Sequence, residues 1–205
     1  MLVFYSKSAH KPAGKGLHEH LASKDKFNDL NKIVDWRKML SNMYVSPFIL
    51  GDEKYNSVEH FFHASKFLKT DSQFAKTFTI NSGSKWAVDP FKAKTAGKAG
   101  RISKNTKVFT TKDFSLPTNV KMRADFYDSI VNKVQLLAWY SKFTQNPLLK
   151  KVLLATGEAR LFHVETVRGK QSKLIHFSGL EKVRDCIHSY PDVQFSANTV
   201  KSILK

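Results

Sequence analysis

The 205-residue sequence has one cysteine, few acidic residues and no long apolar run, and each scarcity excludes something. A single cysteine, Cys186, cannot form a disulfide within the chain, which fits a reducing compartment. The pattern around Cys186 predicts an amphipathic helix, in which we expect the thiol to be buried.

No stretch approaches the roughly 18 apolar residues of a membrane span, and the apolar run at the N-terminus is too short for a signal peptide. We therefore expect a soluble, intracellular (cytoplasmic) protein that makes no contact with membranes.

Acidic residues are half as frequent as basic ones. Seventeen Asp and Glu stand against 34 Lys and Arg, which gives a formal charge of +17. Such an excess favours polyanionic partners such as nucleic acid or nucleotide phosphates. The lysines are scattered, so a solvated lysine surface that selects no partner stays open as an alternative. No zinc-finger or recognition-helix pattern is present, so any nucleic-acid contact would be independent of base sequence.

Motifs for metal ions and nucleotides are scarce as well. Only His18 with His20 and His60 with His63 form close pairs, and neither matches HExxH. We therefore expect no metal and no cofactor. The segment Gly14–Gly16 can bring backbone N–H groups close to a phosphate, but it lacks the P-loop spacing, so a flexible surface loop is the favoured interpretation.

Apolar and aromatic residues are plentiful. The hydrophobic share of 41%, with 16 phenylalanines, predicts a globular protein whose core is rich in aromatic rings. The length fits one domain, which we place at residues 1–190, with an insertion loop at about 9–35 and a C-terminal tail at 191–205.

Apolar spacing and turn residues predict an α+β fold, mostly helical with a small sheet. A turn that begins at Gly51 joins a small hairpin, and Asn56 or Ser57 can cap the helix that follows it. The predicted helices cover residues 58–68, 90–98, about 119–143, 147–155 and 180–188, and the predicted strands cover parts of 1–8, 159–164 and 172–177.

The first of these helices carries Glu59, His63 and Lys66 at positions i, i+4 and i+7, on one stripe beside its apolar face. A carboxylate, an imidazole and an ammonium at the edge of a buried face can handle protons and bind phosphate. The competing interpretation is a solvated stripe with ordinary helix ion pairs, each contributing about 0.3–0.5 kcal/mol.

The same region resembles the NADAR (YbiA-like) family. The resemblance rests on a set of segments that occur in the family's order, and no one of them would be specific by itself. The main segments are residues 41–44, 47–48 and 55–67, and the further ones are 4–6, 96–101, 142–149, 153–157 and 180–184. The insertion after Ser8 and the segment 36–42 resemble versions that large DNA viruses carry.

The resemblance implies an N-glycosidase that hydrolyses the C1–N bond of a phosphorylated ribose or an ADP-ribose adduct, such as a riboflavin-pathway intermediate or ADP-ribosylated guanine. It implies Glu59 as the catalytic carboxylate, since bond cleavage builds positive charge on the ribose ring. The residues that it implies for substrate binding are Asn42 (hydrogen bonds), His63 (ribose, at the family's Gln position), Lys66 and Arg101 (phosphate) and Tyr127 (an aromatic platform at the place of a family Trp). Phe126 is the adjacent candidate for the place of that Trp.

One family segment, the bacterial WGDG…N motif, is replaced here by residues 161–170. Three hypotheses therefore stand: an active N-glycosidase; a catalytically degenerate NADAR fold acting as a basic nucleic-acid-binding or virion-associated protein; and an inactive module that senses ADP-ribose. The expected partners are a phosphorylated ribose or ADP-ribose ligand and a nucleic acid that is contacted independently of its base sequence.

Overall fold

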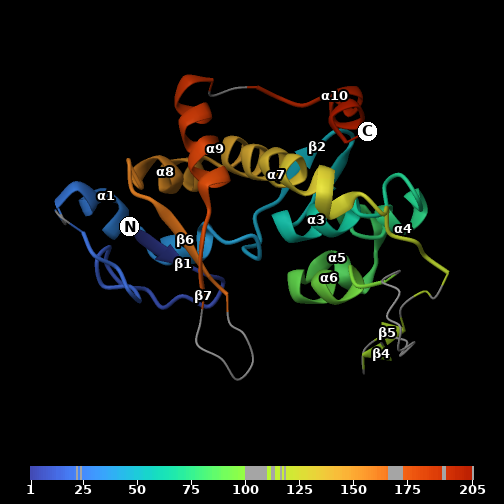
Figure 1. Cartoon of the computed structure of the whole chain (residues 1–205), viewed down its shortest axis with the longest axis horizontal. Helices are drawn as coiled ribbons and strands as arrows, with labels where there is room; N and C mark the ends of the chain where they lie inside the picture. Colours follow the sequence, from blue (N-terminus) through green and yellow to red (C-terminus); the bar gives the residue numbers. More distant parts are fainter. Residues whose placement is uncertain are drawn as a thin grey trace. The chain divides into compact units, whose positions relative to one another are not determined.

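A computed structural model describes residues 1–21, 23, 25–99, 110–111, 114–115, 117, 119–165, 173–190 and 193–204. The chain divides into two compact units. The first comprises Met1–Tyr44 and Trp139–Gln194, and the second comprises Val45–Ala138 and Phe195–Lys205. Helices predominate over short strands in this part of the chain, so the predicted α+β class is confirmed (Figure 1).

The first unit contains a three-stranded sheet in the order β1-β6-β7. Strands β1 (Leu2–Phe4) and β6 (Leu161–Glu165) are parallel, with Leu2 opposite Leu161, and β7 (Lys173–His176) pairs with β6 antiparallel. The helical elements of this unit are η1 (Asp25–Phe27), α1 (Asn28–Asn31), α2 (Trp36–Met39), α8 (Pro147–Ala155) and α9 (Ser178–Ser189). Helix α9 is tied to β6 through the backbone N–H of Leu161, which donates to Glu181 Oε1 at 2.7 Å.

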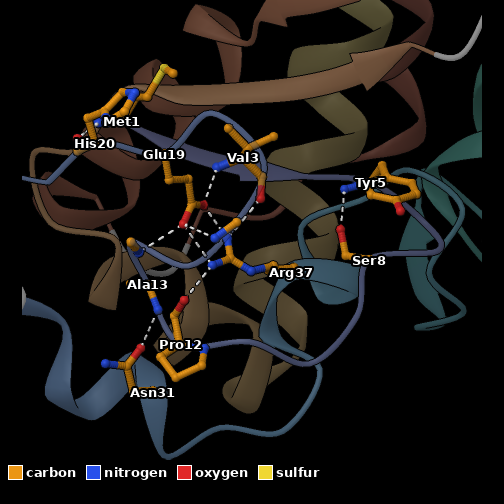
Figure 2. Close-up of polar contacts among 12 residues, drawn as sticks. Met1, Val3, Tyr5, Ser8, Pro12, Ala13, Glu19, His20, Asn31 and Arg37 are labelled. Carbon is orange, nitrogen blue, oxygen red and sulfur yellow. Dashed lines mark hydrogen bonds and ion pairs between the residues drawn. The ribbon is translucent and has the colours of Figure 1, made fainter. Parts of the chain in front are cut away.

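A buried ion pair closes the outer edge of β1 (Figure 2). Val3 donates its N–H to Glu19 Oε1 at 2.7 Å, and its carbonyl accepts from Arg37 at 2.9 Å. Glu19 Oε2 accepts from the backbone N–H groups of Gly14 and Gly16, at 2.8 and 2.9 Å. These N–H groups therefore bind a carboxylate of the same chain, not a phosphate. The segment lies in a loop at the surface, as predicted, with Lys15 exposed, but its backbone N–H groups bind a buried carboxylate that also satisfies the edge of β1.

The second unit begins with the predicted hairpin of β2 (Phe48–Leu50) and β3 (Glu53–Tyr55), which pair antiparallel. Gly51 in the turn has φ +66°, a conformation that favours glycine. The other elements of this unit are α3 (Val58–Ser65), α4 (Ser72–Lys76), η2 (Ile80–Ser82), α5 (Lys85–Val88), α6 (Pro90–Ala96), β4 (Thr110–Thr111), β5 (Phe114–Ser115), the π-helical η3 (Phe126–Ile130) and α10 (Ala197–Ile203). Helix α7 (Val131–Gln145) starts in this unit and ends in the first.

Phenylalanine rings build the core of the second unit. The rings of Phe67, Phe74 and Phe78 lie 4.8–6.3 Å apart in edge-on and stacked arrangements. Such pairs stabilise a core beyond the area that they bury, by about 0.5–1.5 kcal/mol each. The prediction of an aromatic core is confirmed here.

Two expectations from the sequence are wrong. The long helix does not start near Asn119, because residues 119–123 are not helical and Arg123 donates its backbone N–H to the carbonyl of Lys66 at 3.0 Å. The Arg123 N–H is therefore used in a tertiary hydrogen bond, and the Arg123 guanidinium pairs locally with Asp125 at 2.7 Å. Cys186 does lie on a helix, α9, but its side chain is exposed and not buried.

The segment predicted as a C-terminal tail contains helix α10, which buries Val200. The carbonyl of Leu204, just past this helix, accepts a hydrogen bond from Arg123 at 2.5 Å.

Candidate active site

Helix α3 carries the stripe of Glu59 and His63, and Lys66 follows as its C-cap. All three side chains are buried, with residue exposures of 9%, 5% and 2%. The solvated stripe is therefore the wrong interpretation. Ionisable groups are rarely buried without a partner, so three of them within two helical turns mark a candidate functional site.

Glu59 and His63 form a hydrogen-bonded pair. Nε2 of His63 lies 3.0 Å from Oε1 of Glu59, at the i, i+4 spacing that places two side chains side by side on a helix. A carboxylate only accepts, so Nε2 carries the hydrogen and Nδ1 is left as the acceptor in a neutral ring. Nδ1 is buried and has no hydrogen-bond partner in the described part of the chain. The second oxygen of Glu59, Oε2, makes no hydrogen bond to any residue that the structure describes.

Electrostatics agree with that assignment of protons. Burial raises the pKa of Glu59, but the hydrogen bond from His63 and the positive charges of Lys94 and Lys66 outweigh it, so the pKa lies below its usual value. Burial lowers the pKa of His63 against the opposing effect of Glu59. At neutral pH the pair is therefore an ionised carboxylate and a neutral imidazole.

Gly97 fixes the imidazole from its Nδ1 side. A Cβ atom at this position would lie 1.9 Å from Nδ1 and 2.3 Å from Cγ of His63. Only a hydrogen atom fits there, so a glycine directly after α6 is what allows α6 and α3 to approach each other at this point.

Lys66 occupies a cage of its own. Its Nζ donates to the carbonyl of Gly97 at 3.3 Å and lies 5.0–5.8 Å from the ring centroids of Phe62, Phe126 and Tyr127. An ammonium at this distance from ring faces is stabilised by the quadrupoles of the rings. Tyr127, on the π-helical η3, remains 42% exposed. One ring of the cage is therefore open to solvent, and π-helical turns often occur at functional sites.

A second buried histidine on α3 has a different environment. The Oγ of Ser57, the N-cap residue, lies 2.7 Å from Nδ1 of His60 and makes no capping bond to the helix backbone. Burial lowers the pKa of His60 to about 4, so this ring is neutral at physiological pH.

Asn42 lies in the first unit, at a turn held by buried polar groups. Its Oδ1 accepts from Nε1 of Trp139 at 2.6 Å. Lys142, fully buried one turn later on α7, donates to the carbonyls of Met39 and Ser41 at 2.6 and 2.8 Å. Burial lowers the pKa of Lys142 to about 7.

Comparison with known proteins gives the fold. No protein-family model matches the chain, and no curated protein does. Among solved structures, the chain is similar to the NMR structure of the E. coli protein YbiA. The TM-score is 0.53 and the identity 18%, over 75% of this chain and 79% of that one. The chain has a YbiA-like fold.

Within this YbiA-like fold the candidate site residues fall into three groups. Glu59, His63, Lys66 and Tyr127 are connected through the contacts described above. Asn42 belongs to the other unit, and Arg101 lies outside the described residues.

Sequence reasoning missed two residues of the candidate site, Lys94 on α6 and Gly97 directly after it. No residue spacing in the sequence predicts that α6 packs against α3. Within the described residues, no group of three or more His, Cys, Asp or Glu side chains is placed to hold a metal ion. No helix in the same part of the chain is long and apolar enough to cross a membrane.

Proposed function

We propose that this protein is an N-glycosidase that hydrolyses the C1–N bond of a phosphorylated ribose or an ADP-ribose adduct, with Glu59 as the catalytic carboxylate. The observation that carries the proposal is the buried Glu59–His63 pair, in which one carboxylate oxygen is bound and Oε2 is not engaged by any described residue. The YbiA-like fold and the NADAR-like segments around Glu59 supply the reaction class.

The reaction needs a carboxylate for two purposes, to stabilise positive charge and to accept a proton. As the C1–N bond breaks, its electron pair leaves with the nitrogen and positive charge develops on the ribose ring, which a nearby carboxylate stabilises. A water oxygen then bonds to C1 and gives its proton to the carboxylate, while the departing nitrogen takes up a proton. Both tasks need an ionised carboxylate, and the lowered pKa of Glu59 keeps it ionised at neutral pH.

The remaining site residues take supporting roles in this proposal. Lys66 supplies positive charge near Glu59, and Tyr127 offers an exposed ring on which a base can stack. His63 contacts the ribose beside the carboxylate. Asn42 contributes a hydrogen bond to the substrate, and Arg101 contributes a phosphate contact.

The net charge of +17 supports a second candidate of another class, a basic protein that binds nucleic acid without reading its sequence. Under this second proposal the protein has the fold but has lost catalysis. Its resemblance to viral versions of the family then points to a virion-associated role. It differs from the first in one consequence: removing the Glu59 carboxylate leaves the binder's function intact.

The test of the proposed function is a release assay. The wild-type protein is incubated with an ADP-ribosylated guanine oligonucleotide and, separately, with a phosphoribosylated riboflavin-pathway intermediate. We expect ADP-ribose or ribose 5-phosphate to appear in one of the two reactions. Release by neither would contradict the proposed function and favour the binding protein.

A further inference from the structure

We propose that Lys94, on α6, binds the phosphate of the substrate next to Glu59, and that Lys66 does not. This inference rests on the proposed function, because it names the residue that recognises the anionic part of that substrate.

Lys66 is poorly placed to bind a phosphate. Its side chain is buried, its Nζ donates to the carbonyl of Gly97, and aromatic rings surround it. To reach a phosphate oxygen it would have to leave both the carbonyl and the rings, and give up interactions already satisfied inside the protein. Its charge nevertheless acts on Glu59 from within the cage.

Lys94 has the opposite properties. Its side chain is exposed, and it makes no hydrogen bond or ion pair with any residue that the structure describes. It precedes Gly97 by three residues, so the two lie on the same face of the helix. Gly97 touches the imidazole of His63, which places the base of Lys94 one turn from the Glu59–His63 pair.

The charge of Lys94 also reaches the pair. Burial has the largest effect on the pKa of Glu59 and of His63, and the positive charge of Lys94 lowers both. A substrate phosphate close to an ionised carboxylate needs a cation to offset their repulsion, and neutral His63 cannot supply one. Lys94 is an uncommitted cation at that place.

The test measures binding, which separates this inference from catalysis. ADP-ribose, ribose 5-phosphate and unphosphorylated ribose are titrated calorimetrically into wild type, K94A and the control K92A at about 0.15 M salt, near physiological ionic strength. Lys92 is on the same helix, five residues before Gly97, and so faces elsewhere, while K92A removes the same charge. We expect K94A to weaken both phosphorylated ligands about tenfold or more, with ribose unaffected and K92A like wild type.

Three results would overturn the role of Lys94. The first is equal affinity of K94A and K92A for the phosphorylated ligands, and the second is no binding of either phosphorylated ligand by wild type. The third is a loss of binding in K66A but not in K94A, where circular dichroism shows that K66A is folded. The proposed function fails separately, if E59Q releases product as fast as wild type. K94A can still lose affinity in that case, so the two failures are distinguishable.

Discussion

Nε2 of His63 lies 3.0 Å from Oε1 of Glu59, and both side chains are buried on one face of α3. The pair holds one carboxylate oxygen in place and leaves Oε2 without a partner among the described residues. Members of the family that this region resembles carry Gln at the position of His63, and a Gln side-chain amide can donate the same hydrogen bond. We therefore expect that either residue at position 63 orients Glu59 and keeps it ionised.

The first prediction concerns the pH profile of activity. In H63L the hydrogen bond that lowers the pKa of Glu59 is lost while the burial that raises it remains, so the pKa of Glu59 rises. Because the reaction needs the carboxylate form, activity in H63L will fall off at a higher pH than in wild type as the solution is acidified. H63Q should restore the wild-type profile. Superimposable acid limbs in H63L and wild type would show that His63 does not control Glu59.

The second prediction concerns Gly97. In G97A the new methyl group would lie 1.9 Å from Nδ1 of His63, so the ring or α6 must move. We expect a loss of about 1–3 kcal/mol in the free energy of unfolding, as is typical of overpacking, together with reduced glycosidase activity.

G83A is the matched control. Gly83 has φ +68°, and no atom lies within 4 Å of the place that a Cβ would take, so its substitution costs only backbone strain, about 1 kcal/mol, and should spare activity. Urea unfolding and the release assay measure both effects. Equal activity in the two variants would contradict the steric role of Gly97.

The third prediction concerns Lys142 and stability. Burial lowers its pKa to about 7 in the folded protein from 10.5, so between these values the unfolded chain binds more protons than the folded one. Stability therefore rises with pH across this window, by at most about 1.4 kcal/mol per pH unit from this group. K142M lacks this contribution, so the difference in unfolding free energy between wild type and K142M should grow in favour of wild type from pH 7 to pH 10. Parallel curves of unfolding free energy against pH for wild type and K142M would contradict this prediction.

Local patterns predicted much of the fold. The spacing of apolar residues located α3, and the turn at Gly51 located the hairpin β2–β3. The helix predicted to begin at Pro90 does so as α6, and in the structure the Asp89 carboxylate caps it by accepting from the N–H of Phe91 at 2.7 Å. These features depend on residues close in sequence, which is why they could be read from it.

Long-range partners could not be predicted in this way. The N–H groups of Gly14 and Gly16 bind Glu19, whose carboxylate also pairs with Arg37. Helix spacing put Glu59, His63 and Lys66 on one stripe but did not show that the stripe is buried, because burial depends on Gly97 and α6 closing over it. Gly97 and Lys94 enter the candidate site only through tertiary contacts, which also set the directions of the pKa shifts of Glu59 and His63.

The central claim, that Glu59 is the catalytic carboxylate of an N-glycosidase, is tested most directly by E59Q in the release assay. Gln keeps the size of the side chain and removes its charge, so the fold, checked by circular dichroism, should persist. We expect the rate of ADP-ribose or ribose 5-phosphate release to fall at least about 100-fold relative to wild type. Equal rates of release in E59Q and wild type would contradict the account.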